Sequence, residues 1–154
     1  MVVIDTDVLL LAFAFQNDSR QETNTAFLSE VQKAEPAITV YNLMEILGQL
    51  SFNLAPAKLA NWKSWLIDAY QLTVIWPVGP EDLTPAMAFF QAEIVDHPFA
   101  KMRIQRMAFM DALVLNLAER TPEVQCFVTW NARHFKDKSP VTVLTPEQYL
   151  KQVA

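Results

Sequence analysis

Short apolar segments alternate with longer stretches of helical periodicity, and this alternation constrains the fold more than any other feature. The apolar runs, which are typical of buried strands, cover residues 2–4, 37–40, 72–76, 126–129 and 141–144. Strands that alternate with helices form a mainly parallel sheet with helices on both faces. We therefore expect residues 1–154 to form a single three-layer α/β domain whose sheet has about five strands.

Several helix boundaries have local signals. Asp7 can cap a short apolar helix after the first strand, and residues 19–22 (SRQE) form a capping box for the next helix. Asn42 is the expected N-cap of the helix after the second strand. Pro98 is expected to separate one helix from a longer one that follows, and residues 145–148 (TPEQ) form a second capping box.

Scarce residue types exclude several classes of protein. Gly48 and Gly79 are the two glycines, so the chain has neither a phosphate-binding P-loop nor a glycine-rich dinucleotide turn. A single cysteine, Cys126, excludes a disulfide framework and a cysteine-based zinc site. His97 and His134 are too few for a three-histidine metal site.

The longest unbroken apolar run covers residues 8–15, far short of the roughly 20 residues that span a bilayer. The segment before it carries Asp5 and Asp7 and no cation, unlike a secretory signal. We therefore expect a cytoplasmic protein without a membrane segment.

Charge is distributed unevenly along the chain. The net charge of −5 argues against general affinity for nucleic acid, but residues 97–154 carry a net +3. The cations in this part form two groups, Lys101 with Arg103 and Arg106, and Arg133 with Lys136 and Lys138. These groups are either ordinary solvated faces or a phosphate-binding rim on an acidic body.

Oxygen-bearing side chains follow the expected strands. Asp5 comes directly after the first strand, Glu45 starts the helix after the second, and Thr129 and Asn131 end the fourth. Asp111 lies on the core-facing stripe of a helix whose N-terminal half returns to the same sheet edge. Three converging carboxylates repel one another, and a hard cation such as Mg²⁺ or Mn²⁺ would remove that conflict.

Each of these residues also has a purely structural interpretation. Asp5 can bond the N–H groups of a turn, and Asp7 and Glu45 are suited to helix capping. Asn131 is a favoured turn residue, and Asp111 could form a buried salt bridge with an arginine.

Four segments together resemble the motifs of PIN-domain nucleases. They are residues 2–9 (VVIDTDVL), 42–46 (NLMEI), 111–114 (DALV) and 129–135 (TWNARHF), in order along nearly the whole chain. The size is most similar to that of VapC-type toxins of bacterial toxin–antitoxin modules. The resemblance implies a PIN-like domain that cleaves RNA phosphodiester bonds with Mg²⁺ or Mn²⁺, inhibited by a cognate antitoxin and assembled as a homodimer.

The same resemblance assigns roles to individual residues. Asp5, Glu45 and Asp111 would be catalytic and metal-binding, and Asn131 takes the place of a frequent fourth aspartate. Thr129 would support the site, as would Asp7, although the family often has asparagine or serine at that position. The rim residues Lys101, Arg103, Arg106, Arg133 and Lys136 would bind RNA. His134 is a candidate general acid, although packing and hydrogen bonding are its preferred role.

Two other functions remain open. The segment DTDVL at residues 5–9 also fits the opening motif of haloacid-dehalogenase-like phosphatases, in which one aspartate is the nucleophile. That family needs an acidic pair after a late strand, which this chain lacks. The amide of Asn131 is instead compatible with a degenerate PIN module that binds RNA or an antitoxin without cleavage, or with a site that holds one metal firmly and a second only with substrate.

Overall fold

Five strands form one sheet in the order β3-β2-β1-β4-β5, and all neighbouring strands are parallel. In the computed structural model, which describes residues 1–154, the strands are β1 (Val2–Ile4), β2 (Pro36–Thr39), β3 (Thr73–Ile75), β4 (Cys126–Val128) and β5 (Thr142–Leu144). The expected parallel sheet is therefore confirmed. The chain adds β2 and β3 on one side of β1 and then β4 and β5 on the other. The connections after β1 and β4 therefore diverge and leave a crevice at the carboxyl ends of these two strands.

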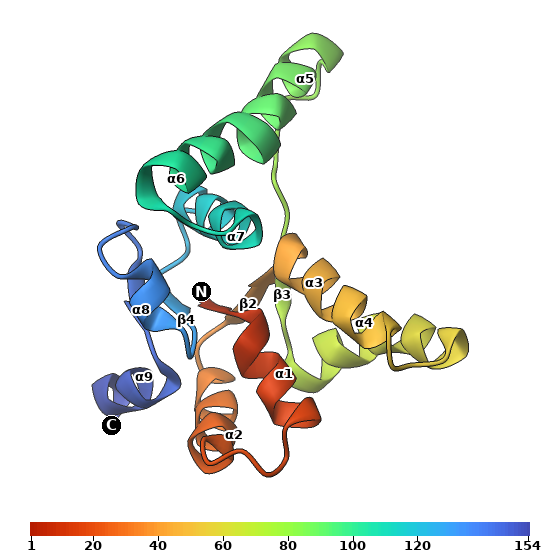
Figure 1. The fold of residues 1–154 in the computed structure, drawn as a ribbon, viewed down its shortest axis with the longest axis vertical. Helices are drawn as coiled ribbons and strands as arrows, with labels where there is room; N and C mark the ends of the chain where they lie inside the picture. Colours follow the sequence, from red (N-terminus) through yellow and green to blue (C-terminus); the bar gives the residue numbers. More distant parts are fainter.

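Helices connect and cover these strands (Figure 1). They are α1 (Thr6–Ala14), α2 (Gln21–Val31), α3 (Val40–Ser51), α4 (Pro56–Tyr70), α5 (Leu83–Gln91), the π-helical turn η1 (Ala92–Asp96), α6 (His97–Gln105), α7 (Phe109–Arg120), α8 (Ala132–Phe135) and α9 (Pro146–Val153). None of these helices has the length and apolar character needed to cross a membrane.

Each face of the sheet has its own hydrophobic core, because alternate residues of a strand point to opposite faces. Val2 and Ile4 of β1 pack with apolar residues of α1, α2, α3, α4 and α9. Val3 points to the other face and packs with residues of α7 and α8. Figure 1 shows α1, α2 and α9 on one side of the sheet and α6 and α7 on the other. The predicted three-layer architecture is confirmed.

Two helices that lead from the central strands begin earlier than expected. The N-cap of α1 is Asp5, whose Oδ1 accepts from the N–H of Thr6 at 2.8 Å, so the prediction of Asp7 as the cap is wrong. The N-cap of α3 is Thr39, whose Oγ1 accepts from the N–H of Asn42 at 3.1 Å. Asn42 therefore lies inside α3, and its side chain is left to bond elsewhere.

The two predicted capping boxes have different outcomes. The box at Thr145 and Gln148 is present with both of its hydrogen bonds, so this prediction is confirmed. The box at residues 19–22 is wrong: α2 begins after Arg20, without a side-chain cap. Asp18 accepts instead from the backbone N–H of Arg20 at 2.9 Å and from its guanidinium, which makes Asp18 the local acceptor.

The predicted helix break at Pro98 is also wrong, because α5, η1 and α6 follow one another without a gap. A π-helical hydrogen bond from the N–H of His97 to the carbonyl of Ala92 precedes the proline, which lies in the first turn of α6 and has no N–H to donate. The break comes at Arg106, which has a left-handed φ of 53°. Asp111 consequently lies in the first turn of α7, not within a longer helix.

A buried charge ties η1 to α7, and it gives a prediction about stability. The Glu93 side chain is 3% exposed, its Oε1 lies 3.0 Å from Nε of Arg120, and its Oε2 accepts from Asn116 at 3.1 Å. Arg120→Ala leaves this carboxylate without its arginine, so we expect the free energy of unfolding in urea to fall by about 1–3 kcal/mol. Arg103→Ala, which removes an exposed arginine, serves as the control. Equal stability of the two variants would contradict the prediction.

Candidate functional site

A small cavity of about 180 Å³ opens at the carboxyl ends of β1 and β4. Its lining includes four carboxylates and two amides from four separate segments of the chain: Asp5, Asp7, Glu45, Gln49, Asp111 and Asn131. The sheet topology explains this convergence, since β1, β2 and β4 are adjacent and parallel and the first turn of α7 returns to the same edge. The structure thus brings together the carboxylates that the sequence analysis singled out.

Hydrogen bonds from three segments of the chain hold Asp5 in place in this cavity. Besides capping α1, its Oδ1 accepts from Nδ2 of Asn42 at 3.0 Å, and its backbone N–H donates to the carbonyl of Val128 at 2.9 Å. Burial, followed by the nearby charge of Asp7 and then that of Asp111, raises the pKa of Asp5 to about 8. In the folded chain Asp5 therefore binds a proton more tightly than an exposed aspartate does.

A hydrogen-bond relay positions Glu45. Thr39 donates to Oδ1 of Asn42 at 2.6 Å, which orients the amide so that Nδ2 faces Asp5 and Oγ1 of Thr6, the latter at 3.2 Å. The hydroxyl of Thr6 in turn donates to Oε2 of Glu45 at 2.6 Å. Because α3 starts at Val40, Glu45 lies in its second turn and not at the capping position that the sequence indicated.

Thr6 and Asn42 have roles in the site that their sequence positions did not predict. Both are buried, and both bond across segments more than thirty residues apart, at separations of 39 and 37 residues. The available signal was Asn42 itself, because an amide among buried apolar residues of a helix must find hydrogen-bond partners.

Asp7 and Thr129 link the ends of β1 and β4. The two carboxylate oxygens of Asp7 accept from Oγ1 of Thr129 and from the N–H of Trp130, both at 3.2 Å. Thr129 is fully buried, and its hydroxyl also accepts from the N–H of Asn131 at 3.0 Å. Burial raises the pKa of Asp7 despite these hydrogen bonds. Asn131 makes no protein hydrogen bond through its side-chain amide.

Asp111 is half-buried and has no cationic partner within salt-bridge distance. Burial and then the charge of Glu45 raise its pKa, while His134 and Lys138 partly oppose that shift. The salt bridges in the structure involve none of the four carboxylates of the cavity. The alternative in which an arginine neutralises Asp111 is therefore wrong, and the site carries uncompensated negative charge.

The donor set fits a hard divalent cation, although no three His, Cys, Asp or Glu side chains form a preformed metal cage. All candidate ligands are oxygens, as Mg²⁺ and Mn²⁺ prefer. Mg²⁺ usually keeps several waters and binds through one or two carboxylates and substrate phosphates, so it does not need a closed cage. A bound cation would also oppose the burial and the carboxylate repulsion that raise the pKa of Asp5.

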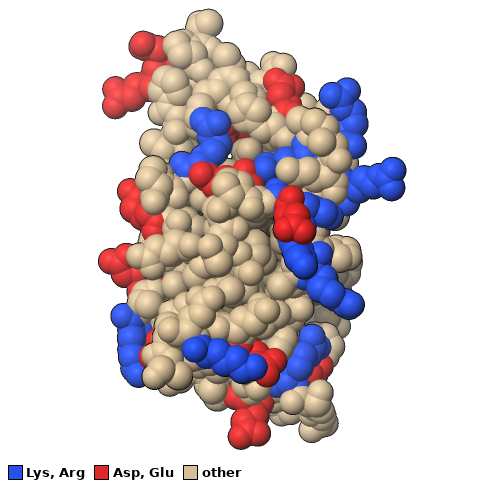
Figure 2. Space-filling model, turned by 90° about the vertical axis from the view of Figure 1, so that its left-hand side faces the viewer, with Lys and Arg blue, Asp and Glu red and all other residues tan.

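The predicted basic rim is only partly free to bind a ligand. Lys101 pairs with Glu119 at 2.6 Å, and both side chains are only 14% exposed, so Lys101 is less free than the other rim cations and its RNA-binding role stays a prediction. The remaining predicted cations are exposed and form no salt bridge: Arg103, Arg106, Arg133 and Lys136. On the face that carries α6, α8 and α9, cations gather toward one side of the upper half and acidic side chains toward the other (Figure 2).

His134 lies on α8, beside the cavity. Its side chain is exposed, so the preferred packing role is wrong. Its backbone N–H donates to the carbonyl of Asn131 at 2.9 Å, and its proximity lowers the pKa of Asp111.

No protein-family model matches the sequence, and no curated protein matches it significantly. The class that the coordinates define is a three-layer α/β domain with an acidic cavity at the reversal point of a parallel sheet. Conclusions about function therefore depend on the motifs and on the chemistry of that cavity.

Proposed function

We propose that this protein is an endoribonuclease that hydrolyses RNA phosphodiester bonds with Mg²⁺ or Mn²⁺, as its resemblance to PIN-domain nucleases implies. The observation that carries the proposal is the convergence of Asp5, Glu45 and Asp111 on one cavity without any cationic partner. Such a site is costly unless a cation binds there, and divalent cations bound to carboxylates are common catalysts of displacement at phosphorus.

Each residue has a distinct part in this proposal. Asp5 and Asp111 hold the metal ion, which supplies activation of a water molecule and stabilisation of charge on the phosphoryl group when it is bound. Glu45, oriented by Thr6, positions the water molecule or a metal ligand. Asn131 offers a neutral amide oxygen, a weaker ligand than a carboxylate. For this reason we propose one firmly bound metal ion and a second that binds only with substrate.

The direct test is a cleavage assay with single-stranded RNA. We expect cleavage in Mg²⁺ or Mn²⁺ and its loss when the metal is removed by a chelator. Absence of cleavage of any RNA in either metal would contradict the nuclease and favour the degenerate module, for which the amide of Asn131 is the supporting observation. The phosphatase alternative is disfavoured because β4 is followed by Thr129 and Asn131, and β5 by Thr145, without an acidic pair.

A partner is also proposed, namely a second copy of the chain. Helix α5 buries none of its residues, and it extends away from the body of the molecule (Figure 1). An apolar stripe of Leu83, Met87, Phe90, Ile94 and Phe99 runs along α5, η1 and α6 and is exposed to solvent. The end of the molecule that α5 forms is mostly uncharged in Figure 2.

Charge favours an antiparallel arrangement of the two copies. Glu81 and Asp82 precede the stripe and Arg103 and Arg106 follow it, so each end would meet the opposite charge of the partner. We expect Met87→Glu to convert a dimer into a monomer in analytical ultracentrifugation. Phe52→Glu, at an 88% exposed side chain outside the stripe, is the control. A dimer that persists in the Met87 variant would contradict this surface. The cognate antitoxin implied by the resemblance stays a prediction.

A further inference from the structure

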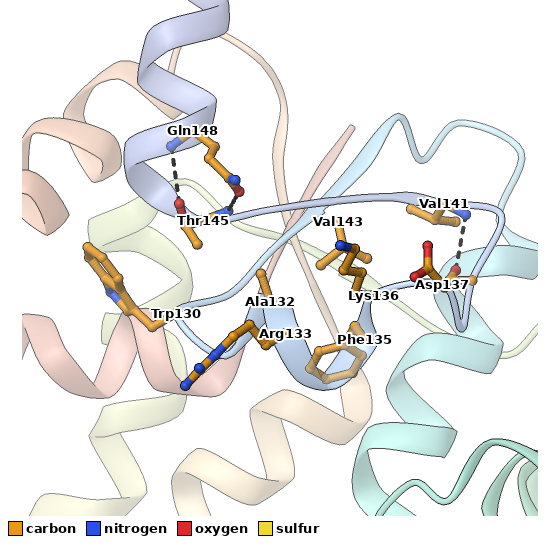
Figure 3. Close-up of a pocket in the computed structure, with 11 residues that line it drawn as sticks. Trp130, Ala132, Arg133, Phe135, Lys136, Asp137, Val141, Val143, Thr145 and Gln148 are labelled. Carbon is orange, nitrogen blue, oxygen red and sulfur yellow. Dashed lines mark hydrogen bonds between the residues drawn. The ribbon is translucent and has the colours of Figure 1, made fainter.

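A second and larger cavity, of about 630 Å³, lies directly beside the acidic one. It is formed by the segment after β4, by α8, by β5 and by the start of α9 (Figure 3). Phe135 lines both cavities. Of two consecutive residues, Trp130 lines the larger cavity and Asn131 lines the acidic one. The segment from Trp130 to Phe135 therefore borders both cavities.

Trp130 gives the larger cavity an aromatic wall that is already fixed. Its indole Nε1 donates to Oδ1 of the buried Asn24 at 2.8 Å, and the guanidinium carbon of Arg20 lies 5.4 Å from the centre of its ring. Val141 and Val143 of the β5 segment add apolar surface to the lining. An aromatic ring held in place in a cavity that aliphatic side chains also line is suited to stacking against an unpaired base.

Polar groups in the same cavity lack protein partners. Arg133 and Lys136 line it, are exposed and form no salt bridge, with Asp137 as the acidic residue of the lining. The side-chain oxygen of Gln148 accepts from the N–H of Thr145 at 2.9 Å, whereas its Nε2 donates to no protein group. The site therefore presents two cations suited to phosphates and one amide donor suited to a base edge.

We infer that this cavity binds one nucleotide of a single-stranded RNA, adjacent to the phosphate held at the acidic cavity. The base lies against Trp130 within reach of Gln148, and Arg133 and Lys136 bind the flanking phosphates. The inference rests on the proposed function, which supplies RNA as the ligand. Duplex RNA does not fit the site, because its bases remain paired and stacked.

The first test measures binding without cleavage, using a short fluorescent single-stranded RNA in the presence of a chelator. We expect the double variant Arg133→Ala, Lys136→Ala to bind at least about tenfold more weakly than the wild type. The slope of log affinity against log salt should fall by about 1.4, or about 0.7 for each lost phosphate contact. The matched control is Lys58→Ala, Lys63→Ala, which removes two exposed cations on α4.

The second test isolates the base. RNAs with one abasic site at successive positions are expected to reveal one position where loss of the base weakens binding to the wild type about tenfold. The same abasic site should have little effect on Trp130→Ala, since the stacking surface is already lost, and Trp130→Phe should retain the effect. These comparisons use differences between ligands on one variant, so a general change in its folding does not imitate them.

Several outcomes would overturn the inference. They are unchanged affinity and salt dependence in the Arg133 and Lys136 double variant, equal binding of duplex RNA, or no abasic position that depends on Trp130. Failure of the nuclease proposal has a different signature: the wild type binds RNA as described but does not cleave it when Mg²⁺ or Mn²⁺ is added. If the double variant cleaves RNA with an unchanged KM, the nuclease proposal stands and the proposed nucleotide-binding cavity is refuted.

Discussion

Asp5→Asn is expected to lower metal-dependent RNA cleavage by about a thousandfold or more. The substitution removes a proposed metal ligand, and a loss of about 4 kcal/mol of transition-state stabilisation corresponds to that factor. The amide keeps an oxygen that can accept from the N–H of Thr6 and from Asn42, as the carboxylate does now. The local structure should therefore survive while the charge is lost.

Stability separates this effect from misfolding. Without metal, burial and the charges of Asp7 and Asp111 destabilise the ionised form of Asp5. The neutral amide should therefore leave the variant at least as stable as the wild type. Asp68→Asn, at an exposed aspartate of α4, provides the matched control and should cleave RNA normally. Cleavage that survives in Asp5→Asn would refute the proposed centre.

The second large effect is an inverse dependence of metal-free stability on pH. The pKa of Asp5 is about 8 in the folded chain and 3.8 as its ordinary value, so the folded state binds the proton more tightly than the unfolded state. Its contribution to stability is complete below about pH 4 and is lost as the pH rises through about 8. One such proton changes the free energy of unfolding by at most about 1.4 kcal/mol per pH unit.

Urea unfolding without metal between about pH 5 and pH 8 measures this dependence, and Asp5→Asn should flatten it. Addition of Mg²⁺ should stabilise the wild type more at about pH 8 than at about pH 6, because the cation competes with protons for the carboxylates. Calorimetric titration should show one tight site without RNA. Stability that rises with pH in the metal-free wild type, or two tight sites, would contradict this account.

Local patterns predicted most of the fold but misplaced several helix boundaries. The apolar strands were found because a buried strand needs only a few consecutive apolar residues. Asparagine suits a cap position, so the sequence predicts Asn42 as the cap, yet Thr39 provides the acceptor and α3 starts sooner. Pro98 was expected to end a helix, whereas a π-helical turn precedes it and the helix continues. A competing hydrogen-bond acceptor thus decided the start of α3, whereas the π-helical turn let the chain pass Pro98 without a break.

The candidate site was predictable as far as topology alone could place its residues. Asp5, Glu45 and Asp111 could be placed at one edge because a parallel sheet with helical connections returns each segment to that edge. The relay from Asn42 through Thr6 could not be predicted, because it depends on the side-chain positions of two helices relative to each other.

The order of apolar and polar segments by itself determined the parallel sheet and the edge at which the carboxylates emerge, since both follow from chain order and local periodicity. Only the tertiary structure decided which charges are neutralised. Lys101 of α6 forms a salt bridge with Glu119 of α7, whereas Asp111 forms none and its pKa is raised by burial and by Glu45. Ion pairing depends on distance through space, which the spacing of residues along the chain does not specify.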